Sequence, residues 1–293
     1  MPTTLSPLRY PGGKSSLSNF LASTIHLNGL MGGTYVEPFC GGAGAAINLL
    51  LTGQVSKIIL NDIDDMIYYF WFSILNYTDL FIRKIESTSV DIAEWRKQRE
   101  ILNDPSSSIF DKGFAAFFLN RCNRSGILRA NPIGGLAQSG KWLINARFNK
   151  KNLINKIERI ATFQEHIMIK NKNAIEFIKD DILTIEEKVF IYYDPPYYKQ
   201  GPLLYLNALA DYEHAKLASE IIRDKKNIWI LTYDKNPQIE HLYYSAVIIP
   251  FQLNYSAHLH KKGEEILIAP NHIKLPQHSP SPYYGRKIFL QQQ

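Results

Sequence analysis

The stretch TYVEPFCGGAG, residues 34–44, passes from a short apolar run into a cluster of three glycines. The helix-forming run AAINLLL, residues 45–51, follows at once. Glycines between a strand and a helix let the backbone approach a ligand closely, and the helix N-terminus offers unpaired N–H groups. The order Gly-Gly-Ala-Gly differs from the GxGxxG dinucleotide pattern, and a plain tight turn explains such a loop about as well.

Strand and helix patterns alternate along most of the remaining chain. Buried-strand signals fall at residues 34–39, 57–60, 166–170, 189–193 and 227–233, and helical patterns such as residues 212–222 lie between several of them. This alternation predicts an α/β fold, with a mostly parallel sheet covered on both faces. Residues 245–255 and 264–269 are strand signals with no helix between them, so we expect an antiparallel hairpin that closes the sheet.

Composition narrows the class of protein. The chain has 293 residues, 45% of them hydrophobic and 20% charged, as is ordinary for a globular protein. A net charge of +6 suits a polyanionic partner, although many proteins without one are equally basic. The two cysteines, Cys40 and Cys122, lie too far apart for a zinc motif. Without a signal peptide or a membrane-length apolar run, we expect a cytoplasmic protein.

Asp62 ends the second strand signal. A carboxylate at that place can accept both hydroxyl groups of a ribose, which indicates a cofactor containing adenosine at the carboxyl ends of the strands. The alternative is that Asp62 caps the following helix.

The strand of residues 189–193 runs directly into Asp194-Pro195-Pro196-Tyr197. Two consecutive prolines hold the backbone rigid and lack N–H donors, so the carbonyl groups and the Asp194 carboxylate remain as acceptors. Acceptors on both hydrogens of an exocyclic amine draw its nitrogen toward sp³ geometry and direct the lone pair at an electrophile. Tyr197 can stack on a base that has left the helix. The alternative is a simple turn at the end of a strand.

In combination these motifs resemble the Dam-type adenine-N6 DNA methyltransferases, the D12 class or α group, over roughly residues 8–269. The segment LRYPGGK at residues 8–14 is similar to the N-terminal motif of that family, as are LYLN at 204–207, WILTYD at 229–234, Tyr255-Ser256 and KKGEE at 261–265. The resemblance implies a Rossmann-like, seven-stranded, mostly parallel sheet and S-adenosylmethionine as the cofactor, without a metal.

The resemblance also implies a set of site residues. Asp194, Pro195, Pro196 and Tyr197 match the catalytic motif, and Lys14 is expected near the methionine carboxylate of the cofactor. Asn173 stands where the family often has an acid, and its amide oxygen can still accept a hydrogen bond from the adenine amino group. The residues expected to bind the cofactor are Tyr10, Lys14, Glu37, Pro38, Phe39, Gly41, Gly42, Gly44, Asp62, Ile63, Asn173 and Asp194.

The stretch 76–155 breaks the alternation of strands and helices and is rich in Arg, Lys and Asn. We expect a largely helical insertion that recognises double-stranded DNA, between the two halves of a catalytic domain at residues 1–75 and 156–270, with a weakly packed tail at 271–293. In the family the comparable segment is a hairpin-like arm that enters DNA, and Arg129 then reads a guanine edge. The other expected DNA contacts are Arg121, Arg124 and Asn131, with a solvated basic face as the alternative.

The hypothesis is therefore a site-specific methyltransferase that transfers a methyl group from S-adenosylmethionine to N6 of adenine in DNA, with a cognate restriction endonuclease as a possible partner. One alternative is an amino-methyltransferase that acts on cytosine N4, an RNA adenine or a protein amide. The other is a DNA-binding protein that has lost catalysis.

Overall fold

The computed structural model describes residues 4–9, 14–198, 209–251 and 265–277. Within these residues, seven strands form one mixed sheet in the order β3-β2-β1-β4-β5-β7-β6. The strands from β3 to β5 are parallel, and β7 is antiparallel to both β5 and β6. The strands are β1 (Thr34–Glu37), β2 (Lys57–Asn61), β3 (Ile167–Lys170), β4 (Phe190–Tyr193), β5 (Ile228–Asp234), β6 (Val247–Phe251) and β7 (Glu265–Ala269).

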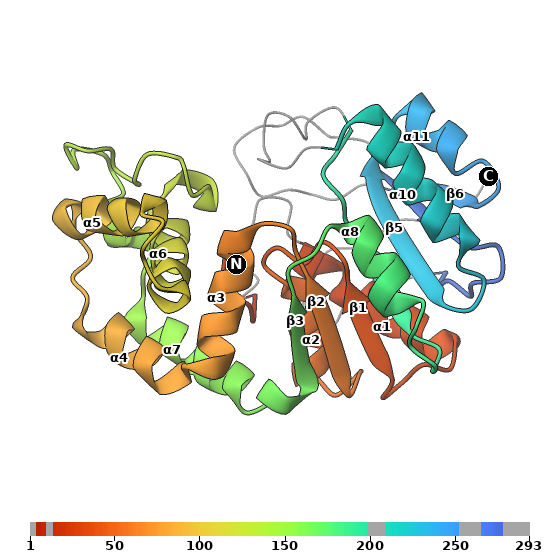
Figure 1. Ribbon diagram of the computed structural model, residues 1–293, viewed down its shortest axis with the longest axis horizontal. Coiled ribbons are helices and arrows are strands. Elements are labelled where there is room, and N and C mark those ends of the chain that lie inside the picture. The colour runs from red at the N-terminus through yellow and green to blue at the C-terminus, as the bar shows by residue number, and fades with distance from the viewer. Residues whose placement is uncertain (1–3, 10–13, 199–208, 252–264, 278–293) are drawn as a thin grey trace.

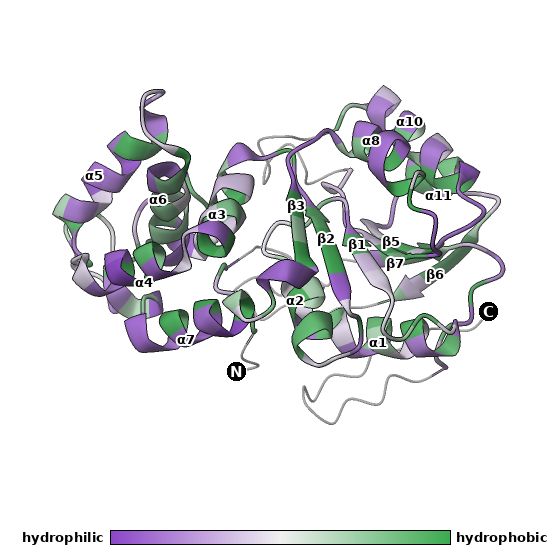
Figure 2. Ribbon diagram, turned by 60° about the horizontal axis from the view of Figure 1, so that its bottom comes forward, coloured by the Kyte–Doolittle hydropathy of each residue, from purple (hydrophilic) through white to green (hydrophobic). Residues whose placement is uncertain are grey.

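Helices cover both faces of the sheet, and each face has its own apolar core (Figures 1 and 2). One core holds Tyr35, Leu60 and Tyr192 together with side chains of the helices that precede and follow β1. The other holds Val36 and Ile191. The helices on the first face are η1 (Lys14–Leu17), α1 (Ser18–Leu27) and α2 (Gly44–Leu51), and those on the second are α8 (Ala174–Phe177), the π-helical turn η5 (Ile178–Ile182), α10 (Asp211–Arg223) and α11 (Pro237–Leu242).

The expected doubly covered α/β sheet is thus confirmed, and so is the terminal hairpin. Every parallel strand was predicted within two residues of its bounds, because each leaves a short run of mostly apolar residues in the sequence. The hairpin is antiparallel, but its second strand, β7, lies between β5 and β6. The segment after β7 packs on the end of α1, where Lys274 N donates to Asn28 Oδ1 at 3.0 Å and Asn28 Nδ2 donates to the Lys274 carbonyl at 2.8 Å.

The chain segment that connects β2 to β3 forms a helical lobe, which lies beside the sheet (Figure 1). Its centre is an aromatic cluster in which Phe70 stacks on Phe117 with ring centroids 5.8 Å apart and Phe81 packs edge-on against both. In this lobe the helix of residues 65–76 packs closely on the helix of residues 109–122, and the helix of residues 150–161 packs on those of residues 65–76 and 78–87. Its elements are α3 (Asp65–Asn76), α4 (Thr78–Ser87), α5 (Ile92–Asn103), α6 (Ile109–Cys122), η2 (Arg124–Gly126), η3 (Ile144–Arg147), α7 (Lys150–Ala161) and η4 (Gln164–His166).

None of the helices in the described part of the chain is both long enough and apolar enough to cross a membrane.

Candidate active site

Four polar side chains meet at the edge of the sheet where the parallel strands end. Side chains alternate between the faces of a strand, so residues at matched positions of neighbouring strands share a face. Tyr192 pairs with Ile230, which places Asp194 and Thr232 one step further on the same face. Thr232 pairs with Leu267, which brings Glu265 to that face as well. Glu37, the last residue of β1, completes this group.

Lys14 links the Asp194–Tyr197 motif to β7. Its Nζ lies 3.2 Å from Asp194 Oδ1, 2.6 Å from the Tyr197 hydroxyl and 3.9 Å from Glu265 Oε2. The Tyr197 hydroxyl donates to Glu265 Oε1 at 2.8 Å. The Lys14 and Glu265 side chains are almost fully buried, and a buried ammonium requires carboxylate partners of this kind. Lys14 therefore lies against the Asp194–Tyr197 motif and, with Glu265, holds the Tyr197 hydroxyl in place.

A short chain of buried hydroxyl groups supports the Asp194 carboxylate by hydrogen bonds. Thr232 Oγ1 donates to Asp194 Oδ1 at 2.9 Å, and the Tyr192 hydroxyl lies 2.8 Å from Thr232 Oγ1. Thr232 and Tyr192 are buried, whereas the Asp194 side chain keeps 23% of its surface exposed. Asp194 is thus the member of this group that a substrate can reach.

The glycine loop is tied to the end of β2 through Asp62. Gly41 N donates to Asp62 Oδ2 at 2.8 Å, and Asp64 N donates to Asp62 Oδ1 at 3.0 Å. Gly41 has a φ of 45°, in the region that favours glycine. Asp64, not Asp62, caps α3 through the backbone N–H of Met66. A carboxylate has about four lone-pair positions, so Asp62 retains acceptor capacity for a ligand.

Burial raises the pKa of two acids in this cradle. The Asp62 pKa is raised to about 7, an increase opposed by its hydrogen bonds from the backbone of Asp64 and Gly41. The Glu37 pKa is raised to about 8, although the Tyr35 hydroxyl and Ala46 N both donate to Oε1. Shifts of this kind gather where a cleft binds or transforms a ligand.

The other residues expected to bind the cofactor line the same edge. Ile63 is an apolar side chain with 44% of its surface exposed, directly beside Asp62. Asn173 caps α8, and its Oδ1 accepts from Ile175 N at 2.9 Å. The Pro38 carbonyl accepts from Asn61 at 3.0 Å, and Phe39 packs on the core beneath the loop. Gly42 and Gly44 lead into α2, where a Cβ on Gly44 would lie 3.2 Å from the Ser15 Cβ. Tyr10 lies outside the described residues, as do residues 204–207, Tyr255-Ser256 and residues 261–264 of the resemblance.

The expected DNA-binding segment closes on itself like a hairpin. Asn123 and Pro132 form an antiparallel bridge, and Arg124 N donates to the Asn131 carbonyl at 3.0 Å. Arg124, Arg129 and Asn131 are exposed on this segment. The charge of Arg129 opposes the burial that raises the Asp64 pKa, so Arg129 lies near the acidic start of α3.

Arg121 is placed differently from the other three. Its Nε donates to the Arg147 carbonyl at 2.8 Å, its Nη2 donates to the same carbonyl, and its Nη1 donates to the Pro7 carbonyl at 3.4 Å. These bonds hold the backbone of the lobe, and they favour a structural role over the expected contact with DNA.

The base of the hairpin segment is clamped to the segment that precedes Lys14. Asn120 Oδ1 accepts from Arg9 N at 2.8 Å, and Asn120 Nδ2 donates to the carbonyls of Arg9 and Gly126 at 2.7 and 2.9 Å. Sequence reasoning did not find this clamp, nor the roles of Thr232 and Glu265. The only signal for Thr232 and Glu265 in the sequence was that both lie within segments that resemble motifs of the family. Trp142, with 66% of its surface exposed beside Lys141, was also missed, although an exposed aromatic residue in a basic segment is such a signal.

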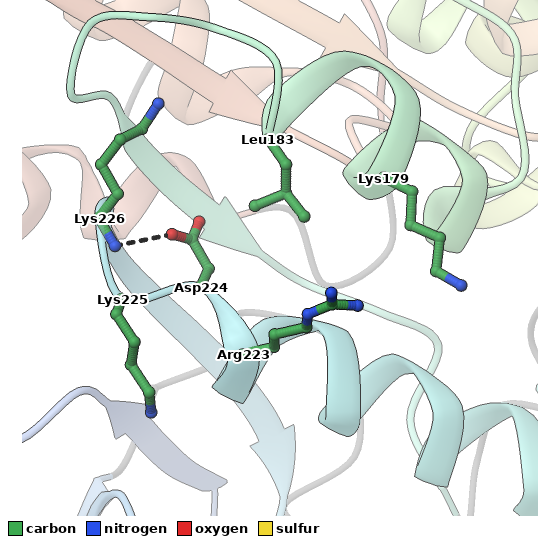
Figure 3. Close-up of a pocket in the computed structure, with 6 residues that line it drawn as sticks. All are labelled: Lys179, Leu183, Arg223, Asp224, Lys225 and Lys226. Atoms are coloured by element: carbon green, nitrogen blue, oxygen red, sulfur yellow. Dashed lines mark hydrogen bonds between the residues drawn. The ribbon is translucent and has the colours of Figure 1, made fainter.

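A separate pocket lies at the opposite end of the strands (Figure 3). Two of its charged groups have local partners: Lys179 pairs with Glu220 at 3.1 Å, and Asp224 accepts from the backbone of Lys226 and Asn227. Ligands of open α/β sheets bind at the carboxyl ends of the strands, so the Asp62–Asp194 edge is the candidate site and this pocket is not. The pocket is lined by Lys179, Leu183, Arg223, Asp224, Lys225 and Lys226.

Comparison with known proteins points to one family. The family model described as "D12 class N6 adenine-specific DNA methyltransferase" matches residues 10–257. The Type II methyltransferase M.MjaIII of Methanocaldococcus jannaschii is 25% identical over 208 residues, which cover 65% of this chain and 68% of that protein. The modification methylase StsI of Streptococcus sanguinis is 27% identical over 210 residues, and these cover 66% of this chain but only 28% of that protein.

Among solved structures, the rRNA methyltransferase aviRa from Streptomyces viridochromogenes has a TM-score of 0.40 at 13% identity, covering 89% of this chain and 86% of the other. TrmK of M. capricolum, in complex with S-adenosyl-homocysteine, has a TM-score of 0.35 at 9% identity, covering 86% of this chain and 69% of the other. Likeness at this level carries no argument about the site.

Proposed function

Because the chain belongs to the D12 class of N6 adenine-specific DNA methyltransferases, we propose that the Asp194 edge of its sheet is where a methyl group is transferred to N6 of adenine in DNA. The observation that carries this proposal is the Asp194 carboxylate, fixed by Lys14 and Thr232 yet still exposed at the end of β4. The family implies S-adenosylmethionine as the methyl donor.

The residues at this edge fit that donor. Loop 41–44 brings the backbone close to a ligand, Asp62 keeps lone pairs for two ribose hydroxyl groups, and the exposed Ile63 offers an apolar surface to an adenine ring. Asn173, Glu37 and Lys14, with Tyr10 in the neighbouring segment, would complete the site. When bound, S-adenosylmethionine supplies an electrophilic methyl group on a sulfonium centre.

The chain's own residues prepare the attacking amine. Asp194 accepts one N–H of the adenine amine and the Pro195 carbonyl accepts the other, which localises the lone pair on nitrogen. Tyr197, whose hydroxyl is held by Lys14 and Glu265, provides a fixed ring for stacking the flipped base. Transfer would form the new N–C bond as the methyl–sulfur bond of the donor breaks, leaving S-adenosylhomocysteine, and one proton of the nitrogen would pass to Asp194 or to water. Positioning of the two groups contributes most of the rate.

The helical lobe would contact double-stranded DNA through the hairpin segment 123–132. Its exposed Arg124, Arg129 and Asn131 support this role, and Trp142 with Lys141 extends the surface. We propose residues 76–155 as the core of this recognition domain, with 1–75 and 156–270 as the catalytic domain. Because the relatives include a type II methyltransferase and a modification methylase, we propose a cognate restriction endonuclease as a partner.

Methylation-sensitive sequencing of host DNA, with and without the gene, tests this function. We expect N6-methyladenine at one recurring sequence only when the gene is present. Methylcytosine, methylated RNA or a methylated protein amide in its place would favour the rival amino-methyltransferases. No modification, with retained DNA binding, would indicate a protein that has lost catalysis.

Asp62→Ala is expected to weaken binding of S-adenosylmethionine by roughly 1.5–3 kcal/mol, the cost of losing hydrogen bonds to a charged acceptor. Because burial raises the Asp62 pKa to about 7, affinity of the wild-type protein should rise between pH 6 and pH 8 as the carboxylate ionises. Calorimetry measures both effects, with the exposed Asp65→Ala as the control. If the folded Asp62→Ala protein binds S-adenosylmethionine with unchanged affinity, the role of Asp62 is only to accept the backbone hydrogen bonds of Gly41 and Asp64.

Arg129→Ala is expected to relax the sequence choice more than it weakens overall DNA binding. Loss of a base contact costs about 1–3 kcal/mol at one position of the site, whereas loss of a phosphate contact weakens all sequences alike. Sequencing of methylated plasmid DNA and the salt dependence of binding separate the two. Arg159→Ala, an exposed arginine on α7, is the matched control. Uniform weakening with a shallower salt slope would assign Arg129 to the DNA backbone.

A further inference from the structure

The two oxygens of the Asp194 carboxylate have different surroundings. Thr232 Oγ1, at 2.9 Å, and Lys14 Nζ, at 3.2 Å, both contact Oδ1. Among the described residues, none forms a hydrogen bond with Oδ2. The carboxylate is therefore anchored through one oxygen and presents the other.

The direction of the supporting hydrogen bonds follows from the chemistry of the groups. An ionised carboxylate only accepts, so the single Thr232 proton points at Asp194. Thr232 Oγ1 must then accept from the Tyr192 hydroxyl, 2.8 Å away. Burial raises the Tyr192 pKa well above its ordinary value, and the Asp194 charge raises it further, so Tyr192 keeps its proton. The chain runs in one direction, from Tyr192 to Thr232 to Asp194 Oδ1.

The geometry assigns Thr232, oriented by Tyr192, as a positioning residue for methyl transfer: it saturates Oδ1 of Asp194 so that Oδ2 receives the hydrogen bond of the adenine amine. This inference rests on the proposed role of Asp194. Thr232 would act only through Asp194, because it is fully buried under the carboxylate. Without the Thr232 hydroxyl, the Asp194 carboxylate can rotate toward Lys14, and the adenine amine loses a fixed acceptor. Binding of cofactor and DNA should be little affected.

The test uses the full chain, adenine-unmethylated plasmid DNA and S-adenosylmethionine with a labelled methyl group, under single-turnover conditions. Thr232→Val has nearly the same shape without the hydroxyl, and Thr232→Ser keeps the hydroxyl. We expect Thr232→Val to lower the rate about 10- to 100-fold, as for a lost hydrogen bond to a charged group, with dissociation constants for cofactor and DNA unchanged. Thr232→Ser should restore the rate to within about threefold of wild type, and Tyr192→Phe should lower it severalfold.

The double variant Thr232→Val/Asp194→Ala separates positioning from general damage to the fold. If Thr232 acts through Asp194, adding Thr232→Val to Asp194→Ala lowers the residual rate no further. A further fall in that background, or failure of serine to restore the rate, would overturn the inference. A wild-type rate in Thr232→Val, with Asp194→Ala inactive, would also overturn the inference about Thr232. The proposed function would be unaffected by that result. If Asp194→Ala itself retains the wild-type rate, the proposed function fails first. Should Thr232→Val not fold, an unchanged rate in Tyr192→Phe overturns the inference.

Discussion

Asp194→Ala is expected to lower the rate of adenine methylation by about 10²–10³-fold or more, while the protein stays folded and still binds DNA. In the proposed mechanism Asp194 accepts a hydrogen bond from the attacking nitrogen, so its removal would leave the lone pair delocalised into the ring and the amine poorly directed. A larger loss is expected if Asp194 also accepts the departing proton. The Asp194 side chain is 23% exposed, and Lys14 keeps its contacts with Tyr197 and Glu265, so the fold should tolerate the change.

Single-turnover assays at saturating S-adenosylmethionine separate this chemical effect from weaker cofactor binding. Asp194→Asn should be similarly impaired, because the amide keeps an acceptor but loses the charge. Asp180→Ala, an exposed acid on η5, is the control for surface charge. Transfer to adenine at a near wild-type rate by folded Asp194→Ala would show that the mechanism proposed for this site is wrong.

Gly113→Val is expected to destabilise the protein by on the order of 3 kcal/mol, through the contact between α6 and α3. A Cβ at Gly113 would lie 2.3 Å from the Tyr69 carbonyl oxygen and 2.4 Å from Ser73 Oγ, far inside van der Waals contact. Replacing glycine within a helix normally gains up to about 1 kcal/mol of propensity, so the steric cost decides the sign. Thermal or urea unfolding measures the change.

Two variants test this explanation. Arg96→Val, at an exposed position of α5, measures the cost of valine in a helix without a clash. Gly113→Ala/Ser73→Ala removes the contact with the serine hydroxyl but leaves the Tyr69 carbonyl, so we expect that it does not restore stability. Equal stability of Gly113→Val and Arg96→Val would contradict the close helix contact.

The strands, and the place of Asp194-Pro195-Pro196-Tyr197 at the end of one of them, were predictable because their signals are local. A buried strand leaves an apolar run, and the run at residues 189–193 leads directly into Asp194. The family matched by the chain is the one that the motifs resemble. The roles of the individual site residues remain predictions.

The tertiary structure determined which of the residues in these motifs lie next to one another. Thr232 reaches Asp194 because β5 pairs with β4, and Glu265 reaches Lys14 and Tyr197 because β7 pairs with β5. No local pattern in the sequence specifies either pairing. Alternation tells which residues of one strand share a face, but register and strand order arise from contacts far apart in the chain. Arg121 lies in a basic segment of the kind that contacts DNA. Its hydrogen bonds to the carbonyls of Arg147 and Pro7 depend on how the lobe packs against residues 4–9. Residue type and spacing thus fixed the chemistry available at the sheet edge, whereas long-range packing selected the groups that support Asp194.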